Sequence, residues 1–334
     1  MIISSPRLIA SPDVSVFIIT YNQEKTIAQT IESILAQQGD FKMEVVIGDD
    51  GSADNTPGIC KEYQQKYPNQ IRLLLKEKNE GIVKNFVDSI RLCRGKYIGI
   101  CAGDDYWIDE LKIEKQLVFF KNNPDYGVVS TGGYRLLVKK NKMVEGIAPI
   151  HPVEDGRVFD YTWRGGVYAM PLSLLIKSEL LGYVDFDEFI KRDFTVEDVP
   201  LQAILAHHTR FGHIPDLCVV YRVYNTSQTF TNLNSPNYLK YHQGLINIRR
   251  YLNELFPEVE FSEQWAHDTM VYRKFLIAVY RLDYMNAKKE LENLQKVGTK
   301  EKRAKKYIKT RIGFYIFAFV KRMKLHYVAQ FIKE

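Results

Sequence analysis

The amino-acid sequence predicts an α/β fold built around a mostly parallel β-sheet. Two observations lead to this fold class. Short apolar runs rich in β-branched residues, which are typical of strands buried on both faces, alternate with segments whose apolar residues recur at helical spacing. Such an alternation forms βαβ units, in which successive strands run parallel within one sheet.

The first 130 residues carry the clearest elements. Residues 14–20 (VSVFIIT) are expected to form a buried strand, and apolar residues at helical spacing over 27–35 predict the next helix, which Gly39 is suited to end. The pattern then predicts strands at 44–48, 71–75 and 96–102, and helices at 59–67 and 82–92.

From residue 127 to residue 230 the pattern is less regular, and after residue 237 it is helical. The expected strands here are 128–130, 135–138 and 217–223, and the expected helices are 171–180 and 199–207. We therefore divide the chain near Ser235, into a domain of residues 1–235 and a helical C-terminal region of residues 236–334.

Composition restricts the class of protein. The 334 residues are 46% hydrophobic and 26% charged, a globular composition. The four cysteines have no paired spacing, which argues against a zinc module or a disulfide framework and suits a reducing compartment. The N-terminus lacks the features of a signal peptide, and no apolar stretch approaches the roughly 20 residues of a membrane-spanning helix. We therefore expect a cytoplasmic protein.

The net charge of +6 is unevenly distributed. Residues 286–334 contain 14 basic and 4 acidic residues, whereas the first 285 residues contain 32 basic and 36 acidic residues. Within residues 300–324, ten basic residues accompany aromatic and aliphatic residues at helical spacing. This pattern predicts a helix that binds an anionic membrane surface, and docking of the helix on the body is the alternative. No nucleic-acid-binding module accompanies the basic run, so we expect no nucleic-acid partner.

Polar residues follow three of the predicted parallel strands. Thr20 and Tyr21, with Glu24, follow the first strand, and the pairs Asp49–Asp50 and Asp104–Asp105 follow two others. Ligands of open parallel sheets bind beyond the carboxyl ends of the strands, so these residues are candidates for a binding site. One Asp–Asp pair is common in turns, but two pairs at one edge repel each other and favour a bound cation, such as Mg²⁺ with substrate phosphates.

Glycine-rich phosphate-binding motifs are absent from the sequence. It contains neither G-x-G-x-x-G nor G-x-x-x-x-G-K-[ST], so the Rossmann dinucleotide and P-loop alternatives lack their signatures. A phosphorylated ligand would then depend on the cation and on Lys84 within NEGIVKN, for which a solvated surface charge is the alternative.

Four segments together resemble the nucleotide-sugar domain of the family-2 inverting glycosyltransferases, which have the GT-A fold. They occur in the family's order and spacing, and the resemblance extends over about residues 14–227. The segments are VSVFIITYNQE, EVVIGDDGSADNT, NEGIVKN and GKYIGICAGDDYW. The resemblance implies a Rossmann-like, mostly parallel central sheet flanked by helices, with a C-terminal helical extension and a donor-binding, catalytic domain over residues 1–235.

The resemblance also implies the roles of individual residues in the donor site. The positions implied to bind the nucleotide are Thr20, Tyr21, Glu24, Asp50, Lys84 and Asp104. The first three would border the base, and Asp50 would contact the base or the ribose. Lys84 would approach the phosphates, and Asp104 would lie near the ribose or the diphosphate. Asp105 is implied to bind a divalent cation, Mn²⁺ or Mg²⁺, as the family's DxD-type motif does.

The resemblance places the catalytic base within TVEDVPL, residues 195–201. We prefer Asp198 to Glu197, because the Asp that opens the helix is the usual match, and capping of the helix by both acidic residues is the alternative. Many relatives have a His after the Tyr-Arg segment of the last strand, where this chain has Tyr224. Metal binding is therefore not expected there, and Arg222 and Tyr224 are candidates for phosphate contacts.

Aromatic residues between Asp105 and Asp198 mark the expected acceptor region. Trp107 and Trp163 are candidates to pack against a sugar ring, and a place in the protein core is the alternative for both.

The reaction implied by the resemblance is the transfer of a sugar from a nucleotide-diphosphate sugar, a UDP-sugar by preference, to an acceptor hydroxyl with inversion. The acceptor would be a glycan or glycolipid of the cell envelope, made at the inner face of the cytoplasmic membrane. One alternative is transfer to a polyprenyl phosphate, for which Asp198 would be dispensable because the acceptor is already anionic. Another is a non-catalytic scaffold that binds sugar nucleotides.

Overall fold

The structure is a computed structural model that describes residues 1–147, 155–163, 167–224, 233, 235, 237–294, 304 and 306–331, the last ten of these by backbone alone. Its contacts divide the chain into two compact units, Met1–Tyr224 and Asn225–Glu334, each of which is described by itself. Most of residues 225–236 lie outside the described residues, so the division near Ser235 stays a prediction.

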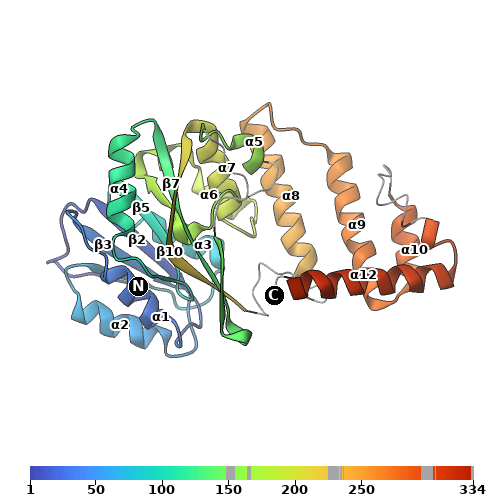
Figure 1. Cartoon of the computed structure of the whole chain (residues 1–334), viewed down its shortest axis with the longest axis horizontal. Helices are drawn as coiled ribbons and strands as arrows, with labels where there is room; N and C mark the ends of the chain where they lie inside the picture. Colours follow the sequence, from blue (N-terminus) through green and yellow to red (C-terminus); the bar gives the residue numbers. More distant parts are fainter. Residues whose placement is uncertain are drawn as a thin grey trace. The chain divides into compact units, whose positions relative to one another are not determined.

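The first unit is built on one mixed sheet, as Figure 1 shows. The strand order is β1-β4-β3-β2-β5-β9-β7-β10-β6, with β8 paired to β7. The strands are β1 (Ile2–Ile3), β2 (Val14–Thr20), β3 (Met43–Asp49), β4 (Ile71–Leu75), β5 (Tyr97–Ala102), β6 (Tyr106–Trp107), β7 (Tyr126–Leu137), β8 (Lys142–Ile147), β9 (Leu175–Lys177) and β10 (Arg210–Val223). Strands β2 to β5 pair in parallel, as do β7 and β10, so the predicted mostly parallel sheet is confirmed.

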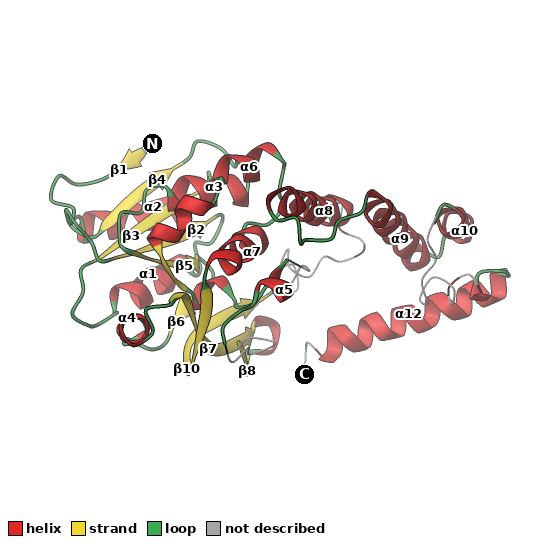
Figure 2. Cartoon of the chain, turned by 90° about the horizontal axis from the view of Figure 1, so that it is seen from above, coloured by secondary structure: helices red, strands yellow, loops and turns green. Residues whose placement is uncertain are grey.

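Helices flank this sheet on both faces. They are α1 (Ile27–Leu35), α2 (Thr56–Lys66), α3 (Ile82–Ile90), α4 (Lys112–Asn122), α5 (Phe159–Thr162), α6 (Phe186–Lys191) and α7 (Asp198–His208). Figure 2 shows α3 and α6 on one side of the sheet and α1 and α4 on the other. This arrangement is the predicted α/β architecture.

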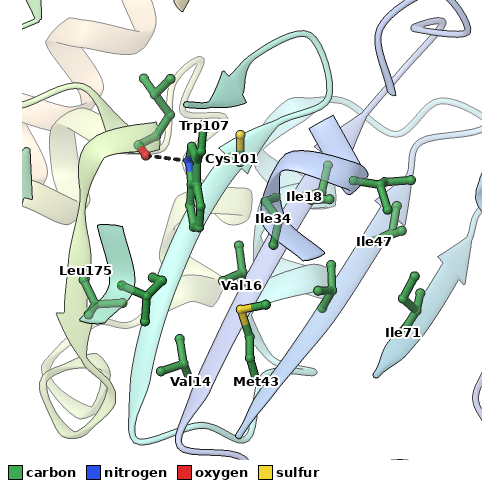
Figure 3. Close-up of a cluster of buried hydrophobic side chains, with 14 of the residues drawn as sticks. Val14, Val16, Ile18, Ile34, Met43, Ile47, Ile71, Cys101, Trp107 and Leu175 are labelled. Carbon is green, nitrogen blue, oxygen red and sulfur yellow. Dashed lines mark hydrogen bonds between the residues drawn. The ribbon is translucent and has the colours of Figure 1, made fainter. Parts of the chain in front are cut away.

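Side chains alternate along β2, so this strand places apolar residues on both faces of the sheet, and helices bury both sets. Val14, Val16 and Ile18 pack with Ile34 of α1 in the main hydrophobic cluster (Figure 3). The intervening Phe17 lies on the other face, with its ring centroid 5.1 Å from that of Phe86 in α3. A strand buried on both faces reads as a continuous apolar run, which is the pattern that residues 14–20 show.

Two sequence predictions for the region after residue 127 were wrong in detail. Residues 171–180 do not form the expected helix: a short 3₁₀ turn (Pro171–Ser173) leads into strand β9, and a second 3₁₀ segment (Ser178–Tyr183) follows. Strand β9 pairs antiparallel with both β5 and β7, which buries Leu175 and Ile176 completely. The two short strands expected at 128–130 and 135–138 are one strand, β7.

The second unit is helical in the residues that the structure describes, as predicted. It comprises α8 (Tyr238–Leu255), α9 (Glu263–Arg281), α10 (Tyr284–Glu292) and α12 (Arg311–Phe331). Side chains of α9, α10 and α12 share a small core that includes Phe275, Leu291 and Phe314. Among the described helices, none is long and apolar enough to cross a membrane.

Candidate functional site

The parallel register brings three predicted site segments to one edge of the sheet, beyond the carboxyl ends of β2, β3 and β5. Thr20 ends β2 directly opposite Asp49 at the end of β3. The amide of Asp50 donates to the carbonyl oxygen of Thr20 at 3.0 Å, and the amide of Gly103 donates to that of Ile19 at 2.9 Å. The turns that carry Asp50 and Asp104–Asp105 therefore start side by side.

Asp104 and Asp105 form an acidic turn between β5 and β6. The side chain of Asp105 is only 3% exposed, and its Oδ1 accepts the backbone N–H of Arg222 at 2.8 Å. Burial raises the pKa of both carboxyls, that of Asp105 well above its usual value, and the negative charge of Asp104 raises the pKa of Asp105 further. Two neighbouring carboxylates, one buried and one half-buried, are destabilised as anions unless a cation compensates them.

The acidic turn fits a divalent cation through this pair of carboxyls. The Arg222 amide uses Oδ1 of Asp105, which leaves Oδ2 for a cation. The described residues contain no group of three or more His, Cys, Asp or Glu side chains placed to bind a metal. The protein would therefore supply one or two carboxylates, and phosphate and water would supply the remaining ligands, an arrangement usual for Mg²⁺.

The loop after β2 carries the residues expected beside the base. Thr20 is buried, and its hydroxyl donates to Gln23 Oε1 at 2.7 Å, while the Gln23 side chain is also hydrogen-bonded to Asp104. Tyr21 and Glu24 are exposed, and Glu24 accepts the backbone N–H of Asn55 at 3.0 Å. The structure thus links Thr20 to the acidic turn and leaves Tyr21 and Glu24 on the surface at the same edge.

Asp50 is buried and already bonded to protein. Its two carboxylate oxygens accept the backbone N–H groups of Glu80 at 3.1 Å and Gly81 at 2.9 Å. The ammonium group of Lys76, whose side chain is 7% exposed, lies 3.4 Å from the same carboxylate. Asp50 therefore fixes the loop before α3, and its predicted contact with the base or the ribose stays a prediction.

Lys76, which no sequence motif indicated, lies between three carboxylates. Besides Asp50, its Nζ lies 3.1 Å from Asp88 and 3.3 Å from Glu80. Asp88 also pairs with Lys84, the lysine expected to approach the phosphates, at 2.5 Å. The Lys84 side chain is 37% exposed, so a phosphate that reaches it would compete with Asp88. That role for Lys84 stays a prediction.

Glu197, which is buried, and Asp198, which is half-buried, form a second acidic pair at the start of α7. Burial, followed by the charge of Asp198, raises the pKa of Glu197 to about 8, and burial raises the pKa of Asp198. Oδ1 of Asp198 accepts the N–H of Val199 at 2.8 Å, whereas Glu197 makes no side-chain capping bond. Because α7 ends just before the start of β10, which runs parallel to β7, its first residues lie toward the carboxyl ends of these strands.

The two tryptophans proposed for the acceptor region are core residues in the structure. Trp107 is 3% exposed and donates its indole N–H to the carbonyl oxygen of Leu172 at 3.1 Å (Figure 3). Trp163 is 5% exposed and lies beside Asp160. These positions favour the alternative role of both residues. Residues 164–166, which include the Gly-Gly pair after Trp163, lie outside the described residues.

Tyr224 and Lys112 complete the surroundings of the acidic turn. Burial and then the charge of Asp104 raise the pKa of Tyr224, which places this residue in the electrostatic field of the turn. Lys112, which the sequence analysis did not identify, is fully buried with its ammonium group 4.0 Å from the Trp107 ring centroid. Burial lowers the pKa of Lys112 to about 7.

Comparisons with known proteins agree with this geometry. The sequence profile of Glycosyl transferase family 2 matches residues 15–159. An uncharacterized protein of Mycobacterium tuberculosis is 41% identical over 111 residues, which are 33% of this chain and 32% of that protein. The putative glycosyltransferase EpsE of Bacillus subtilis is 36% identical over 124 residues, 37% of this chain and 44% of EpsE. The chain therefore matches about a third of the length of the mycobacterial protein and less than half of the length of EpsE.

Solved structures share the fold at low sequence identity. S. aureus TarS 1-349 in complex with UDP-GlcNAc matches with a TM-score of 0.53 and 15% identity, over 83% of this chain and 89% of that one. Mannosyltransferase PcManGT from Pyrobaculum calidifontis, in complex with GDP-Man and Mn²⁺, matches with a TM-score of 0.51 and 16% identity, over 96% and 89%. The likeness establishes the GT-A fold.

Proposed function

We propose that the chain transfers a hexosyl group from a nucleotide-diphosphate sugar to an acceptor hydroxyl, with inversion, because the profile of Glycosyl transferase family 2 matches residues 15–159. One observation carries the proposal: the sheet edge where the family resemblance predicts the donor site holds a buried, incompletely compensated acidic turn. Such perturbed carboxyls in a binding region are typical of functional sites.

Asp198 is the proposed general base. It takes the proton of the acceptor hydroxyl while that oxygen attacks the anomeric carbon, and the bond to the nucleotide diphosphate breaks on the opposite face of the sugar. The raised pKa of Asp198 makes its carboxylate a better proton acceptor than an ordinary aspartate. Glu197, with a pKa of about 8, is largely protonated at neutral pH and leaves the negative charge of the pair on Asp198.

Asp104 and Asp105 are the residues that would hold a divalent cation, Mn²⁺ or Mg²⁺. A bound cation would neutralise the negative charge that develops on the leaving diphosphate. PcManGT, which shares the fold, was crystallised with GDP-Man and Mn²⁺, and this supports the assignment.

The donor is proposed to be a UDP-sugar. TarS, which shares the fold, binds UDP-GlcNAc, whereas PcManGT binds GDP-Man, so the fold accommodates either base. The acceptor is proposed to be a glycan or glycolipid of the cell envelope. The name of one further relative, a minor teichoic acid biosynthesis protein of Bacillus subtilis, 27% identical over 80% of this chain, supports an envelope acceptor.

Replacing the base tests the catalytic assignment. We expect Asp198→Asn to lower the rate of sugar transfer by about 100-fold to 10,000-fold, the usual contribution of general base catalysis, and to leave nucleotide binding intact. Asp125→Asn, which changes a carboxylate that is 79% exposed, is the matched control and should retain wild-type activity.

The outcome also separates the alternatives. Near-normal transfer by Asp198→Asn would remove the base assignment and favour a polyprenyl phosphate as acceptor. Nucleotide binding by the wild type without transfer to any acceptor in a panel of glycans, glycolipids and polyprenyl phosphate would favour the non-catalytic scaffold.

The C-terminal helix is proposed to hold the enzyme at an anionic membrane surface, on its cytoplasmic side. One side of α12 packs through Phe314, Phe317 and Ala318, and large apolar side chains stay exposed elsewhere on the helix. The exposed residues are Ile312 (76%), Tyr315 (49%), Ile316 (53%), Phe319 (66%) and Val320 (47%). Exposed basic residues precede them at Lys306, Lys309 and Arg311, whereas residues 300–303 and 305 and the side chains of 322–324 lie outside the described part.

An exposed apolar helix face beside basic residues is the pattern of a helix that lies in the plane of an anionic bilayer. Flotation with liposomes that contain anionic lipid should carry the wild-type chain, and Ile312→Gln combined with Phe319→Gln should reduce the floated fraction severalfold. Absence of flotation by the wild type would remove this part of the proposal.

A further inference from the structure

Arg222 holds the acidic turn from the β10 side. Strand β6, which follows the turn, pairs antiparallel with β10, with Val220 opposite Tyr106 and Val219 opposite Trp107. Continuing this register places Arg222 opposite the acidic turn. Its backbone N–H donates to Asp105 Oδ1 at 2.8 Å, and its guanidinium group donates to the backbone carbonyl oxygen of Asp104. Main chain and side chain of one residue thus bond to both members of the turn.

The Arg222 guanidinium is itself fixed on two further sides. It donates to the side-chain oxygen of Gln29 on α1, and its central carbon lies 4.5 Å from the ring centroid of Tyr106. The residue is 8% exposed. A planar guanidinium with several donors can make such contacts at once, whereas an ammonium group cannot reproduce their directions.

Helix α1 supports the other side of the same turn through hydroxyl groups. The Thr30 hydroxyl lies 2.6 Å from the carbonyl oxygen of Asp105 and 3.0 Å from that of Gly103. The Thr26 hydroxyl also donates to the carbonyl of Gly103, at 2.9 Å. These contacts use backbone oxygens, so the turn is held without consuming its carboxylates.

We propose that Arg222 is a positioning residue that presets the Asp104–Asp105 turn for a divalent cation and the diphosphate of the donor, an inference that rests on the proposed function. Arg222 bonds the main chain of Asp104 rather than its carboxylate, and it takes a single oxygen of Asp105. The carboxylate oxygens that remain are then fixed in place toward the ligand. Groups that orient metal-binding carboxylates typically affect metal affinity by 10-fold to 100-fold.

This role differs from direct contact with phosphate. A direct contact would strengthen nucleotide binding with or without a cation, whereas positioning of the turn strengthens only the binding that depends on the cation. Gln29 distinguishes the two further, because it contacts the guanidinium from α1 and is not among the residues expected to meet the nucleotide.

The experiment measures the affinity of UDP, GDP and dTDP for each variant by calorimetry, in Mn²⁺ and in EDTA. We expect Arg222→Met to reduce the Mn²⁺-dependent gain in affinity at least 10-fold and to change the affinity in EDTA less than 2-fold. Arg222→Lys should not restore the gain, and Gln29→Leu should reduce it to an intermediate level. Arg94→Met, which removes a structural arginine paired with Glu44, should keep the wild-type gain.

Three results would overturn the inference. An unchanged Mn²⁺-dependent gain in Arg222→Met would show that the turn is set without this residue. A loss of affinity in EDTA as large as the loss in Mn²⁺ would indicate direct phosphate contact, and full restoration by Arg222→Lys would indicate a role of charge alone. A wild-type chain that binds none of the three nucleotides would instead overturn the proposed function, and the inference with it.

Discussion

Buried acidic residues at the two ends of the same sheet have different surroundings. At the amino ends of the strands, Glu44 of β3 is completely buried, and its carboxylate accepts bonds from the hydroxyl of Ser15 at 2.6 Å and from the backbone and side chain of Arg94 at 2.5–3.0 Å. At the carboxyl ends, Asp105 is also buried and Asp104 is half-buried; burial raises the pKa of both carboxyls, and the charge of Asp104 raises the pKa of Asp105 further.

The difference supports a structural role for Glu44 and the proposed functional role for Asp105. The fold supplies Glu44 with a cation and several donors, so this charge stabilises the contact between the strands and the loop at Arg94. It supplies Asp105 with one backbone donor and the partly compensating charge of the Arg222 guanidinium, which bonds to the main chain of Asp104, and it places a second negative charge beside it. A carboxyl pair whose negative charge the protein compensates only in part is suited to bind a cation from solution. Without that cation, the uncompensated charge lowers the stability of the fold.

Neutralising one carboxylate at each end should have opposite effects on stability, and this is the largest change we expect. Glu44→Gln should lower the free energy of unfolding by about 3 kcal/mol, because it breaks a buried ion pair. Asp105→Asn should leave the free energy of unfolding unchanged or raise it when no metal is present. Urea denaturation of the metal-free proteins measures both, and equal losses would remove the distinction between the two ends.

Lys112 is a buried charge whose ammonium group donates to Gln116 Oε1 at 2.9 Å and, among the residues that the structure describes, has no carboxylate within bonding distance, so it should weaken the fold at low pH. Its folded pKa of about 7 lies below the unfolded value near 10.5, so the unfolded chain binds more protons between these values and stability rises as pH increases from 7 toward 10.5. Lys112→Met should raise the free energy of unfolding at pH 6–7 by about 2 kcal/mol.

The control for this prediction is the exposed Lys96, whose side chain is 79% accessible. Lys96→Met should leave the pH dependence of unfolding as in the wild type. If Lys112→Met destabilises the chain at pH 6 as much as at pH 10, the ammonium group contributes favourably and the account of its burial is wrong.

Glu197 should show the opposite pH dependence. Its folded pKa of about 8 lies above the ordinary value of 4.5, so its contribution to stability is complete below pH 4.5 and is lost as pH rises through 8. The free energy of unfolding should therefore fall less between pH 4.5 and pH 8 in Glu197→Gln than in the wild type. We expect a difference of at least about 1.4 kcal/mol, the equivalent of one pKa unit. Urea midpoints measured from pH 5 to pH 9 test it; an unaltered slope would contradict the assignment.

The smallest expected effect concerns the hydroxyl of Thr30 beneath the acidic turn. Thr30→Val keeps the shape of the side chain and removes its bonds to the carbonyls of Gly103 and Asp105, which should cost about 1 kcal/mol of stability. Thr162→Val, which removes a buried hydroxyl bonded to the carbonyl oxygen of Phe159 in α5, is a control of the same chemistry. Only Thr30→Val should also weaken Mn²⁺-dependent nucleotide binding.

The sequence predicted the part of the fold that depends on local pattern. Strands β2 to β5 and helix α1 follow from apolar runs and helical spacing, and the acidic turns follow from their place at strand ends. Strand β9 was expected to be helical, because nothing local shows that residues 175–177 lie between β5 and β7. Pairing with strands 46 to 80 residues away in the sequence determined the structure of that segment.

The candidate site was predictable only in the carboxylates proposed to bind the cation and to act as the base. Asp104, Asp105 and Asp198 lie in recognisable motifs. The residues that contact them and hold them in place do not. Arg222 reaches Asp105 across 117 residues of sequence, and Lys76 meets Asp50 only because the two strands that precede them are neighbours in the sheet. Such partners are set by topology, and a single sequence carries no direct signal for them.

The most direct test of the account measures the thermal stabilisation of the protein by UDP or GDP together with Mn²⁺ at pH 7. We predict that the wild type and Glu44→Gln both gain stability when nucleotide and Mn²⁺ are present together, and that Asp105→Asn gains none from adding Mn²⁺ to the nucleotide. If Asp105→Asn were stabilised by Mn²⁺ and nucleotide as much as the wild type, the acidic turn would not be the cation and donor site.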